Sequence, residues 1–555
     1  MSNNKPSPIE KIKTSSKGLR GTLQESLQDE ITGAVREQDH ALIKFHGMYE
    51  QDDRDLREER AAKKLDKLYS FMIRLRIPGG SMTAQQWVAA HHIAGNYSTG
   101  VIKITTRQTI QLHGILKHQI KPTLKDFNAV QLDSIAACGD VNRNVACTSH
   151  PSESAIHEEV HAYADKISRL LLPKTRAFYE IWLDEEKLAE YDETDPLYQD
   201  RYLPRKFKIG IAIPPNNDVD VLTNDLGLIA IIEAGKLIGF NIAVGGGLST
   251  THGNPDTYAR LATVIGFTEG EEKTLKAVYE VLTIQRDYGN RSDRKLARLK
   301  YTLDKMGVEA FREELEKRCG FELQEARPYQ FTERIDRYGW QADHKGNWHY
   351  TLFVENGRVT DEADVPLKTA LLELAETGKL LFRFTSNQNL ILSEISSTDK
   401  TIIDEILARY GILKRDEAIS ALRKNAISCV ALPTCPLALA EAQRYLPVLI
   451  DKIEPLLNKH GLAEENIVTR MTGCPNGCAR PYAAEIGFVG TGPGRYNLHI
   501  GGDREGTRLN TKYKEQLDEA GILDELDKLF GSYKQNQYPK ESFGDYVERT
   551  IITAQ

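Results

Sequence analysis

Two short cysteine motifs near the C-terminal end constrain this chain more than any other feature. SCVALPTCP (428–436) contains Cys429 and Cys435, and TGCPNGCAR (472–480) contains Cys474 and Cys478. Both segments are rich in proline and glycine, so their turns can present sulfur atoms without burying unpaired backbone groups. Four of the 7 cysteines of a 555-residue chain therefore fall within its last quarter. This clustering indicates that the four thiols act together.

The spacing of these thiols leaves three uses open. The patterns C-x5-C and C-x3-C suit an iron–sulfur cluster, because a cluster is larger than one ion and accepts varied loop spacings. A structural zinc site is an alternative, although zinc favours tighter pairs, and unligated core or redox thiols are another. A disulfide scaffold is excluded, because the 7 cysteines are few and unevenly spread. Residues 437–460 predict a helical connection between the pairs, ended by Gly461.

The overall charge and hydropathy exclude several classes of protein. The net charge of −7, from 72 basic and 79 acidic residues, gives no reason to expect a nucleic-acid partner or an anionic membrane surface. The N-terminal MSNNKPSPIEKIKTSSKGLRG lacks the apolar core of a secretory signal, and LGLIAII (226–232) is far too short to span a membrane. We therefore expect a cytoplasmic protein with no membrane partner. The length corresponds to about three domains.

Polar residues alternate with apolar ones in three strand-like segments. In VIKITTRQTIQLHG (101–114), residues of one parity are polar and predict one polar strand face; they are Lys103, Thr105, Arg107, Thr109, Gln111 and His113. MIRLRIPGG (72–80) and LPRKFKIGIAI (203–213) have cationic faces of the same kind, with Arg74 and Arg76 in one and Lys206 and Lys208 in the other. Each face alone is typical of a solvated strand surface. Together with Arg143 in DVNRNVAC (140–147), they also fit an anion site, and both interpretations stay open here.

The chain also contains a candidate internal repeat. GFNIAVGGGLS (239–249) is similar to RYNLHIGGDRE (495–505), and TTRQTIQLHG (105–114) is similar to TSNQNLILSE (385–394). The two pairs occur in the same order, which a duplicated module with a site between its copies would explain; chance recurrence of short glycine motifs is the alternative. The charge of the first copy is missing from the second, where Asn387 stands in place of Arg107. We therefore expect an asymmetric site.

The glycine-rich segments do not match a dinucleotide-binding fingerprint. GTGPGRYNLHIGG (490–502) begins with G-x-G, but Pro493 and a strand-like segment follow where the fingerprint needs a helix. GGGLSTTHG (245–253) lacks the spacing as well. If the protein performs redox chemistry, we expect its electrons to arrive through a partner.

Taken together, these motifs resemble a known family. SCVALPTCP, TGCPNGCARP, TTRQTIQLHG, DVNRNVACTS, LPRKFK and FHGMYEQDDRD (45–55) are similar to the haemoprotein (beta) subunits of assimilatory NADPH-dependent sulfite reductases, in the sulfite/nitrite reductase superfamily. The resemblance runs in register from about residue 20 to the C-terminus. It implies an oxidoreductase that reduces sulfite to sulfide by six electrons, in sulfate assimilation and cysteine biosynthesis. It also implies two coupled cofactors, a 4Fe-4S cluster and siroheme, an iron tetrapyrrole with eight carboxylates.

The resemblance assigns roles to individual residues. The cluster ligands are Cys429, Cys435, Cys474 and Cys478, of which Cys478 also bridges to the siroheme iron, and Asn476 lies near both cofactors. The substrate-binding positions are Arg74, Arg143, Lys206 and Lys208. The siroheme carboxylates are expected to meet Lys103, Thr105, Arg107, Gln111, His113 and Arg205. Four residues receive no role, namely Arg76, Cys138, Cys147 and Cys319.

The implied fold is α/β (α+β), internally duplicated, with a parachute-like domain and two siroheme- and cluster-binding domains around a central cleft. The expected segments are an N-terminal arm for partner or inter-half contacts (1–65), the first half of a parachute-like, ferredoxin-like domain (66–135), a first siroheme- and substrate-binding domain (136–335), the second half of the parachute-like domain (336–412) and a cluster- and siroheme-binding domain (413–555).

The resemblance further implies a partner, a flavoprotein (alpha) subunit that carries FAD and FMN and passes electrons from NADPH, and thus a hetero-oligomer. Siroheme-dependent nitrite reductase, which converts nitrite to ammonia, shares both cofactors and is the nearest alternative. The CPNGCARP sequence and the long FHGMYEQDDRD arm favour a sulfite reductase over a nitrite reductase. A non-enzymatic, zinc-stabilised binding protein is the alternative from another class, and it leaves the three cationic faces unexplained.

Overall fold

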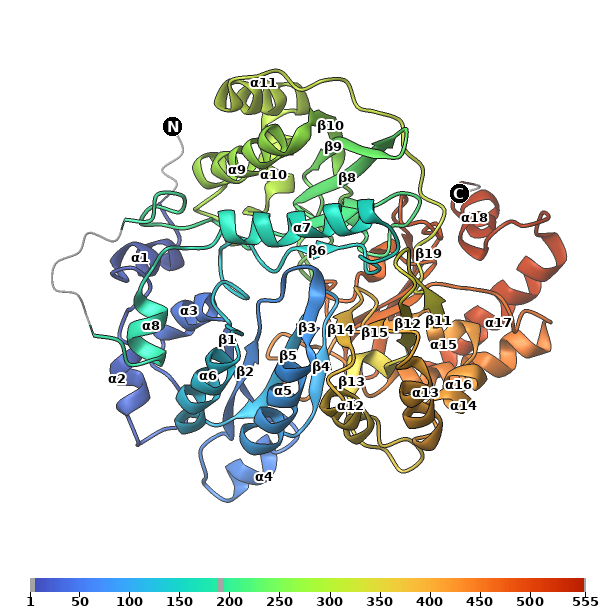
Figure 1. Cartoon of the computed structure of the whole chain (residues 1–555), viewed down its shortest axis with the longest axis horizontal. Helices are drawn as coiled ribbons and strands as arrows, with labels where there is room; N and C mark the ends of the chain where they lie inside the picture. The colour runs from blue at the N-terminus through green and yellow to red at the C-terminus, as the bar shows by residue number, and fades with distance from the viewer. Residues whose placement is uncertain (1–4, 187–193, 554–555) are drawn as a thin grey trace.

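The computed structural model of the chain describes residues 5–186 and 194–553. The described residues form four five-stranded sheets flanked by helices (Figure 1). Two sheets are antiparallel, and the other two mix parallel and antiparallel pairs. Each type occurs once in each half of the chain, so the architecture is a mixed α/β fold that repeats itself.

The two antiparallel sheets have matching strand orders and exchange one strand each. The first has the order β1 (Met48–Asp52), β2 (Tyr69–Arg74), β5 (Ile110–Ile115), β4 (Ile102–Ile104), β13 (Arg358–Val359). The second has the order β11 (Gly339–Ala342), β12 (Trp348–Leu352), β15 (Leu390–Ile395), β14 (Leu381–Phe384), β3 (Ser81–Thr83). Strand β3 of the first half thus pairs with β14, and β13 of the second half pairs with β4. The exchange fastens the two halves to each other.

The other two sheets position the candidate site. Their orders are β6 (Ala146–Cys147), β7 (Ile209–Ala212), β8 (Leu226–Glu233), β9 (Lys236–Val244), β10 (Thr263–Glu269), and β16 (Ala426–Ser428), β17 (Thr469–Thr472), β18 (Ile486–Gly492), β19 (Arg495–Ile500), β20 (Thr511–Leu517). In both, the first three strands are parallel and the last two run antiparallel. The predicted duplication is confirmed, and each glycine motif that indicated it begins in the fourth strand of its sheet.

Helices cover the outer faces of the sheets (Figure 1). In the first half they are α1 (Pro8–Ser15), α2 (Leu23–Gln28), α3 (Asp39–Leu42), α4 (Arg57–Ala62), α5 (Ala84–Tyr97), α6 (Ile120–Ala129), α7 (Ala155–Leu170), α8 (Ala177–Trp182), α9 (Gly270–Tyr288), α10 (Leu299–Met306) and α11 (Val308–Cys319). In the second half they are α12 (Leu367–Glu376), α13 (Lys400–Arg409), α14 (Ile412–Ala418), α15 (Ala421–Lys424), α16 (Leu446–Lys459), α17 (Glu519–Asn536) and α18 (Phe543–Val547). The short turns are η1 (Ile43–His46), η2 (Pro78–Gly80), η3 (Lys117–Gln119), η4 (Val221–Thr223), η5 (Arg294–Leu296), η6 (Glu355–Gly357), η7 (Pro481–Ala483) and η8 (Glu548–Ile552).

Buried apolar side chains form two main cores. The larger core extends from the N-terminal helices through both antiparallel sheets to α14, and the other lies between α16, α17 and the sheet of β16–β20. The halves share the larger core: Trp87 of α5 stacks on Phe382 of β14, with ring centroids 4.4 Å apart. Helix α5 is capped by Thr83, the residue before its first turn, whose side chain accepts a hydrogen bond from the Gln86 N–H in a capping box. Among the described residues, no helix combines the length and apolar character that crossing a membrane requires.

Several local predictions from the sequence differ from the structure. The predicted cationic strand faces are incomplete, because β2 ends at Arg74 and β7 begins at Ile209, so Arg76, Lys206 and Lys208 lie outside the strands. Residues 101–114 form a hairpin of β4 and β5 instead of one strand face, because Gln108 has a φ of +51° and the Thr105 N–H bonds the Thr109 carbonyl at 2.8 Å. Residues 437–445 are turns, and only Leu446–Lys459 of the predicted 437–460 connection is helical. The expectation that 490–502 would not open a helix is confirmed, since the segment contains the end of β18 and the whole of β19.

Candidate functional site

The two cysteine motifs meet at one edge of the fourth sheet. Cys429 follows β16, and Cys474 follows β17 after one intervening glycine. These strands are parallel neighbours, so the loops that leave their carboxyl ends lie side by side. The Gly473 N–H donates to Cys429 Sγ at 3.4 Å, which joins the two loops directly. The sheet thus brings together motifs that are separated by the whole of α16.

The four thiols are free and influence one another. None forms a disulfide, and Cys478 is exposed at the loop surface. Burial, followed by the nearby Cys478, raises the pKa of Cys474 to about 11, and the same two causes raise the pKa of Cys429 and Cys435. Among the described residues, no three or more His, Cys, Asp or Glu side chains converge on a point that one metal ion could occupy. Four free thiols on two neighbouring loops suit a cluster of several metal atoms.

The loops around these thiols are packed too closely for larger residues. A Cβ atom on Gly473 would lie 2.5 Å from the Ala440 carbonyl oxygen and 2.6 Å from Ala431 Cβ. From the N-terminal segment, Arg54 Nη1 donates to the Ala438 carbonyl at 2.6 Å, and the Arg54 N–H donates to the Pro433 carbonyl at 3.3 Å. The loop that carries Cys435 is therefore fixed from both sides.

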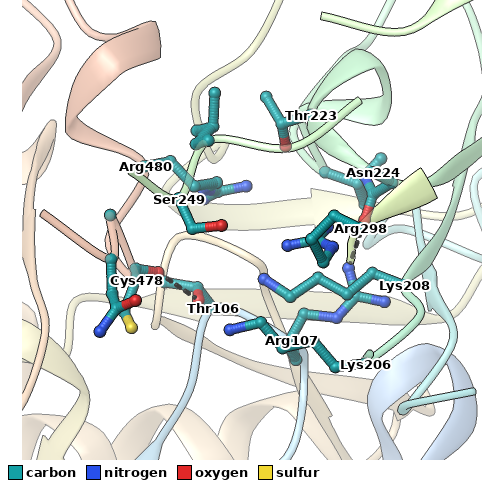
Figure 2. Close-up of a pocket in the computed structure, with 14 residues that line it drawn as sticks. Thr106, Arg107, Lys206, Lys208, Thr223, Asn224, Ser249, Arg298, Cys478 and Arg480 are labelled. Atoms are coloured by element: carbon teal, nitrogen blue, oxygen red, sulfur yellow. Dashed lines mark hydrogen bonds between the residues drawn. The ribbon is translucent and has the colours of Figure 1, made fainter. Parts of the chain in front are cut away.

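A polar pocket opens beside the CPNGC turn. It encloses about 490 Å³ of space, part of it open to solvent. Figure 2 shows Lys206, Lys208 and Arg298 across the pocket from Cys478 and Arg480. The residues that line it are Thr106, Arg107, Lys206, Lys208, Val219, Thr223, Asn224, Leu248, Ser249, Arg298, Asn476, Gly477, Cys478 and Arg480. The pocket therefore joins the cysteine turn of the second half to the cationic segments of the first.

Of the five cations of this pocket, Arg298 and Arg480 form ion pairs with Asp225 and Asp220. Arg107, Lys206 and Lys208 form no ion pair within the described residues. Burial, with a contribution from Arg205, lowers the pKa of Lys206 to about 7, and burial together with Lys206 lowers the pKa of Lys208 well below its usual value. Arg107, at the tip of the β4–β5 hairpin, donates to Asn224 Oδ1 at 2.7 Å and to the Ile209 carbonyl at 2.6 Å. Its Nε, like Arg480 Nε, is buried without a hydrogen-bond partner. Such donors suit carboxylates or small oxyanions.

The other two predicted substrate residues, Arg74 and Arg143, lie outside the lining of this pocket and meet at Cys138. Arg74 Nη1 is 3.5 Å from Cys138 Sγ, and Cys138 is among the groups that raise the pKa of Arg143 against the effect of burial. Arg143 is anchored by its Nε to the Gly139 carbonyl at 2.8 Å. Its charge lowers the pKa of both Arg107 and Lys206, so the two groups of cations are electrostatically connected.

The remaining predicted cofactor residues make contacts within the protein. Lys103 Nζ donates to the Asn356 carbonyl, and Thr105 Oγ1 accepts from the Arg107 N–H at 3.2 Å inside the hairpin turn. Gln111 and His113 contact each other on β5 at 2.9 Å. Arg205 lies beside Asp140 and Arg294, and burial followed by Arg294 lowers its pKa to about 10. Asn476 Nδ2 donates to Cys474 Sγ at 3.6 Å.

Several pocket residues were missed by the sequence analysis. Arg480 stands two positions after Cys478 within a motif already quoted, so its place was a usable signal. Arg298 had no such signal, because its partner Asp225 is 73 residues away in the sequence. The sequence analysis did not select Thr106, because it does not share the parity of the polar residues in 101–114. In the structure its Oγ1 donates to the Cys478 carbonyl at 3.2 Å (Figure 2).

Two family models match the chain. The nitrite/sulfite reductase ferredoxin-like half domain matches residues 63–130 and 341–410, and the nitrite and sulphite reductase 4Fe-4S domain matches residues 162–323. The first model matches twice, once on each antiparallel sheet, in agreement with the duplicated fold. The second match ends before Cys429, so it supports the superfamily without placing the cysteines.

Curated relatives are similar over nearly the whole chain. The sulfite reductase (NADPH) hemoprotein beta-component of Leptospira biflexa is 65% identical over 98% of both chains. The protein of the same name from Anoxybacillus flavithermus is 52% identical over 99% of this chain and 96% of its own. Among solved structures, the Mycobacterium tuberculosis NirA protein has a TM-score of 0.79 at 23% identity, covering 99% of this chain and 97% of that one. This last similarity shows the fold alone.

Proposed function

Because the chain belongs to the family of NADPH-dependent sulfite reductase hemoprotein beta-components, we propose that it reduces sulfite to sulfide. It is an oxidoreductase of sulfate assimilation and cysteine biosynthesis that uses siroheme coupled to a 4Fe-4S cluster. The observation that carries the proposal is the juxtaposition of four free, mutually interacting thiols with a cationic pocket. Within the described residues, three of the cations of that pocket, Arg107, Lys206 and Lys208, form no ion pair. The two sets of residues come from different halves of the duplicated chain.

The residues present fit both cofactors. Cys429, Cys435, Cys474 and Cys478 would hold the cluster, and Cys478, which also lines the pocket, would contact both groups. Arg107 Nε and Arg480 Nε have no hydrogen-bond partner among the described residues and are suited to siroheme carboxylates. We retain as further carboxylate contacts Lys103, Thr105, Gln111, His113 and Arg205, with Asn476 near both groups. When bound, the two cofactors supply electrons one at a time to the sulfur atom.

The side chains of this protein would bind the substrate anion and supply its protons. The net reaction takes hydrogen sulfite, six electrons and six protons to hydrosulfide and three water molecules, so protons must reach each departing oxygen atom. Arg74 and Arg143 are permanent cations that attract the anion. Lys206, with a pKa of about 7, exchanges protons near neutral pH and is suited to deliver them to those oxygens, with Lys208 beside it. No acidic side chain is required for this role.

The electron donor would be a flavoprotein alpha subunit, in keeping with the relatives' designation as NADPH-dependent beta-components. That this subunit carries FAD and FMN, and forms a hetero-oligomer with the chain, is part of the proposal. The cytoplasmic location and the bounds of the five segments expected from the sequence stay predictions.

The experiment that tests this function begins with protein expressed in a host that makes siroheme. We expect tetrapyrrole absorption bands and about four labile sulfides per chain. With reduced methyl viologen as the electron donor, sulfite should yield sulfide with a higher kcat/KM than nitrite yields ammonia. A colourless preparation that contains zinc would overturn the cofactor assignment. A coloured preparation that prefers nitrite would overturn the substrate assignment.

A further inference from the structure

Arg74, at the end of β2, is held by a neutral group, whereas Arg76, two residues beyond the strand, is held by a carboxylate. Arg74 Nε and Nη2 both donate to Gln111 Oε1, at 3.2 and 2.7 Å. Arg76 instead forms an ion pair with Asp133, with Nη2 and Oδ2 2.6 Å apart. No carboxylate of the described chain forms an ion pair with Arg74. The protein thus fixes this guanidinium without neutralising its charge.

The amide of Gln111 is itself oriented by His113. Strands β2 and β5 pair Arg74 with Gln111 in register, so the two side chains share a sheet face. With Oε1 facing the guanidinium, the amide nitrogen of Gln111 faces His113 Nε2 at 2.9 Å. An amide nitrogen only donates, so Nε2 must be the acceptor. A His113 ring with a proton on Nε2 could not accept this hydrogen bond. The Gln111 amide would then tend to rotate away from Arg74.

The tautomer of His113 is in turn fixed by Gln51. Since Nε2 accepts, the imidazole proton lies on Nδ1, which is 2.9 Å from Gln51 Oε1 and donates to it. Burial, followed by the charges of Lys103 and Arg74, lowers the pKa of His113 to about 3. The ring therefore stays neutral at ordinary pH. Gln51, on β1, belongs to the FHGMYEQDDRD segment.

We propose that Gln51, His113 and Gln111 form a neutral hydrogen-bonded chain that aims Arg74 at the substrate anion with its full positive charge. His113 and Gln51 are positioning residues, because they act through Gln111 and not on the substrate. Because both ring nitrogens of His113 are used here, this task replaces the carboxylate contact suggested for His113, whereas Gln111 keeps one amide proton for such a contact. The inference rests on the proposed sulfite chemistry. It also distinguishes Arg74 from Arg76, whose charge Asp133 compensates.

The test compares three variants of the holoenzyme with a matched control. His113→Leu removes the acceptor, His113→Gln restores an acceptor oxygen near the position of Nε2, and Gln111→Glu keeps Arg74 anchored while cancelling its charge. His118→Leu is the control, because His118 is exposed beyond the end of β5. The readouts are the dissociation constant of sulfite for the oxidised protein, measured from the siroheme absorption band, and KM and kcat.

We expect His113→Leu and Gln111→Glu to raise the sulfite dissociation constant and KM about tenfold, since each disturbs hydrogen bonding or charge at a cationic anchor. The kcat should change much less than KM. His113→Gln should recover to within about threefold of the parent, and His118→Leu should match it. If His113→Leu does not load siroheme, the nearly isosteric Gln111→Glu variant still decides the question.

Unchanged sulfite affinity in both His113→Leu and Gln111→Glu would overturn the proposal. A raised dissociation constant in His113→Leu that His113→Gln does not lower would also overturn it, because the effect would then be only structural. A different result would show that the proposed function is wrong: the parent holoenzyme would bind sulfite without reducing it. The comparison of sulfite dissociation constants between the variants would still test the hydrogen-bonded network.

Discussion

At the scale of single residues, Arg298 links the stability of the fold to the charge of the pocket. Its Nε and Nη2 donate to Asp225 Oδ1 and Oδ2 at 2.9 and 2.7 Å, and both residues are buried. Asp225 also accepts the Lys208 N–H at 2.9 Å. Arg298→Met would leave this carboxylate buried without its partner. We expect the free energy of unfolding, measured by urea denaturation, to fall by about 3–5 kcal/mol.

The matched control for this prediction is Arg495→Met. Arg495 pairs with Asp518 at 3.1 Å, but the two side chains are 50% and 53% exposed, so water already solvates both charges. Breaking such a surface pair typically changes stability by about 1 kcal/mol or less. Equal losses in the two variants would mean that burial does not set the importance of the Arg298 pair.

His46 provides a prediction about pH. The ring is fully buried beside Trp182, and its Nε2 is 3.0 Å from the Leu19 carbonyl. Burial lowers the pKa of His46 from 6.5 to about 4. Between these two values the unfolded chain binds the proton and the folded chain does not, so stability is lost as the pH falls from 6.5 through 4. The contribution of this ring is about 3 kcal/mol.

His46→Gln should therefore show a shallower loss of stability in acid than the parent. Glutamine keeps a donor for the Leu19 carbonyl but has no proton to take up in this range. The measurement is the free energy of unfolding at pH 7 and at pH 4 in both proteins. Other buried histidines, such as His150 and His499, contribute equally to the two slopes, so only the difference is informative. Identical slopes would contradict the assignment.

What the sequence could foresee at this scale depends on distance along the chain. The cysteine site could be predicted because each motif is a short, local pattern. The role of Arg298 could not be predicted, because it binds Asp225 across 73 residues and no motif surrounds it in the sequence. Gln111 and His113 were found through parity and resemblance, but their link to Arg74 needed the register of β2 against β5.

At the scale of elements, the close approach of β18 to the cysteine loop leaves no room for a side chain at Gly490. A Cβ atom on Gly490 would lie 2.7 Å from both Ala440 Cβ and the Gly473 carbonyl oxygen. Gly490→Ala must therefore push the strand away from the loop that carries Cys474. We expect fewer iron atoms and labile sulfides per chain than in the parent, measured on protein purified from the same host.

Gly492→Ala is the control for that prediction. It lies on the same strand, and a Cβ atom there meets nothing within 4 Å. The two variants change the same strand by the same methyl group, so they differ only in the contact with the cysteine loop. If both lose cluster components alike, the close packing at Gly490 is not what supports the loop.

Prediction of elements failed where a regular pattern crossed a turn. The polar parity of residues 101–114 continues without interruption through residues 105–109, so periodicity alone predicted one strand. The chain reverses there because Gln108 adopts a positive φ and the side chain of Thr105 binds the turn backbone. Gln388 has a positive φ in the second half as well. Comparison of the two copies marks this turn more reliably than hydropathy does.

At the scale of the whole molecule, the duplication was predictable and the strand exchange was not. The glycine motifs that begin in β9 and in β19 are similar enough in sequence to indicate a repeat. Strand β3, in contrast, has only three residues, and β13 has two. Segments this short carry no periodicity from which a partner could be inferred. Their pairing depends on the shared core of both halves.

Asp220 joins the two halves electrostatically, at the position that Arg480 occupies in the second copy. Each stands immediately before a short helical turn, η4 or η7, in a left-handed conformation. Asp220 forms ion pairs with Arg334, Arg470 and Arg480 at 2.6, 2.6 and 2.9 Å. Although burial opposes it, these three arginines hold the pKa of Asp220 below its usual range.

Removal of this one carboxylate should therefore weaken the joint between the halves. Asp220→Asn leaves three buried guanidinium groups without their shared anion, and we expect a loss of about 3–5 kcal/mol in the free energy of unfolding. Because Arg480 also lines the pocket, the variant should retain less siroheme than the parent. Asp518→Asn, at a surface pair, is the control for both readouts. If Asp220→Asn unfolds at the same urea concentration as that control, the two halves are joined by their core and exchanged strands alone.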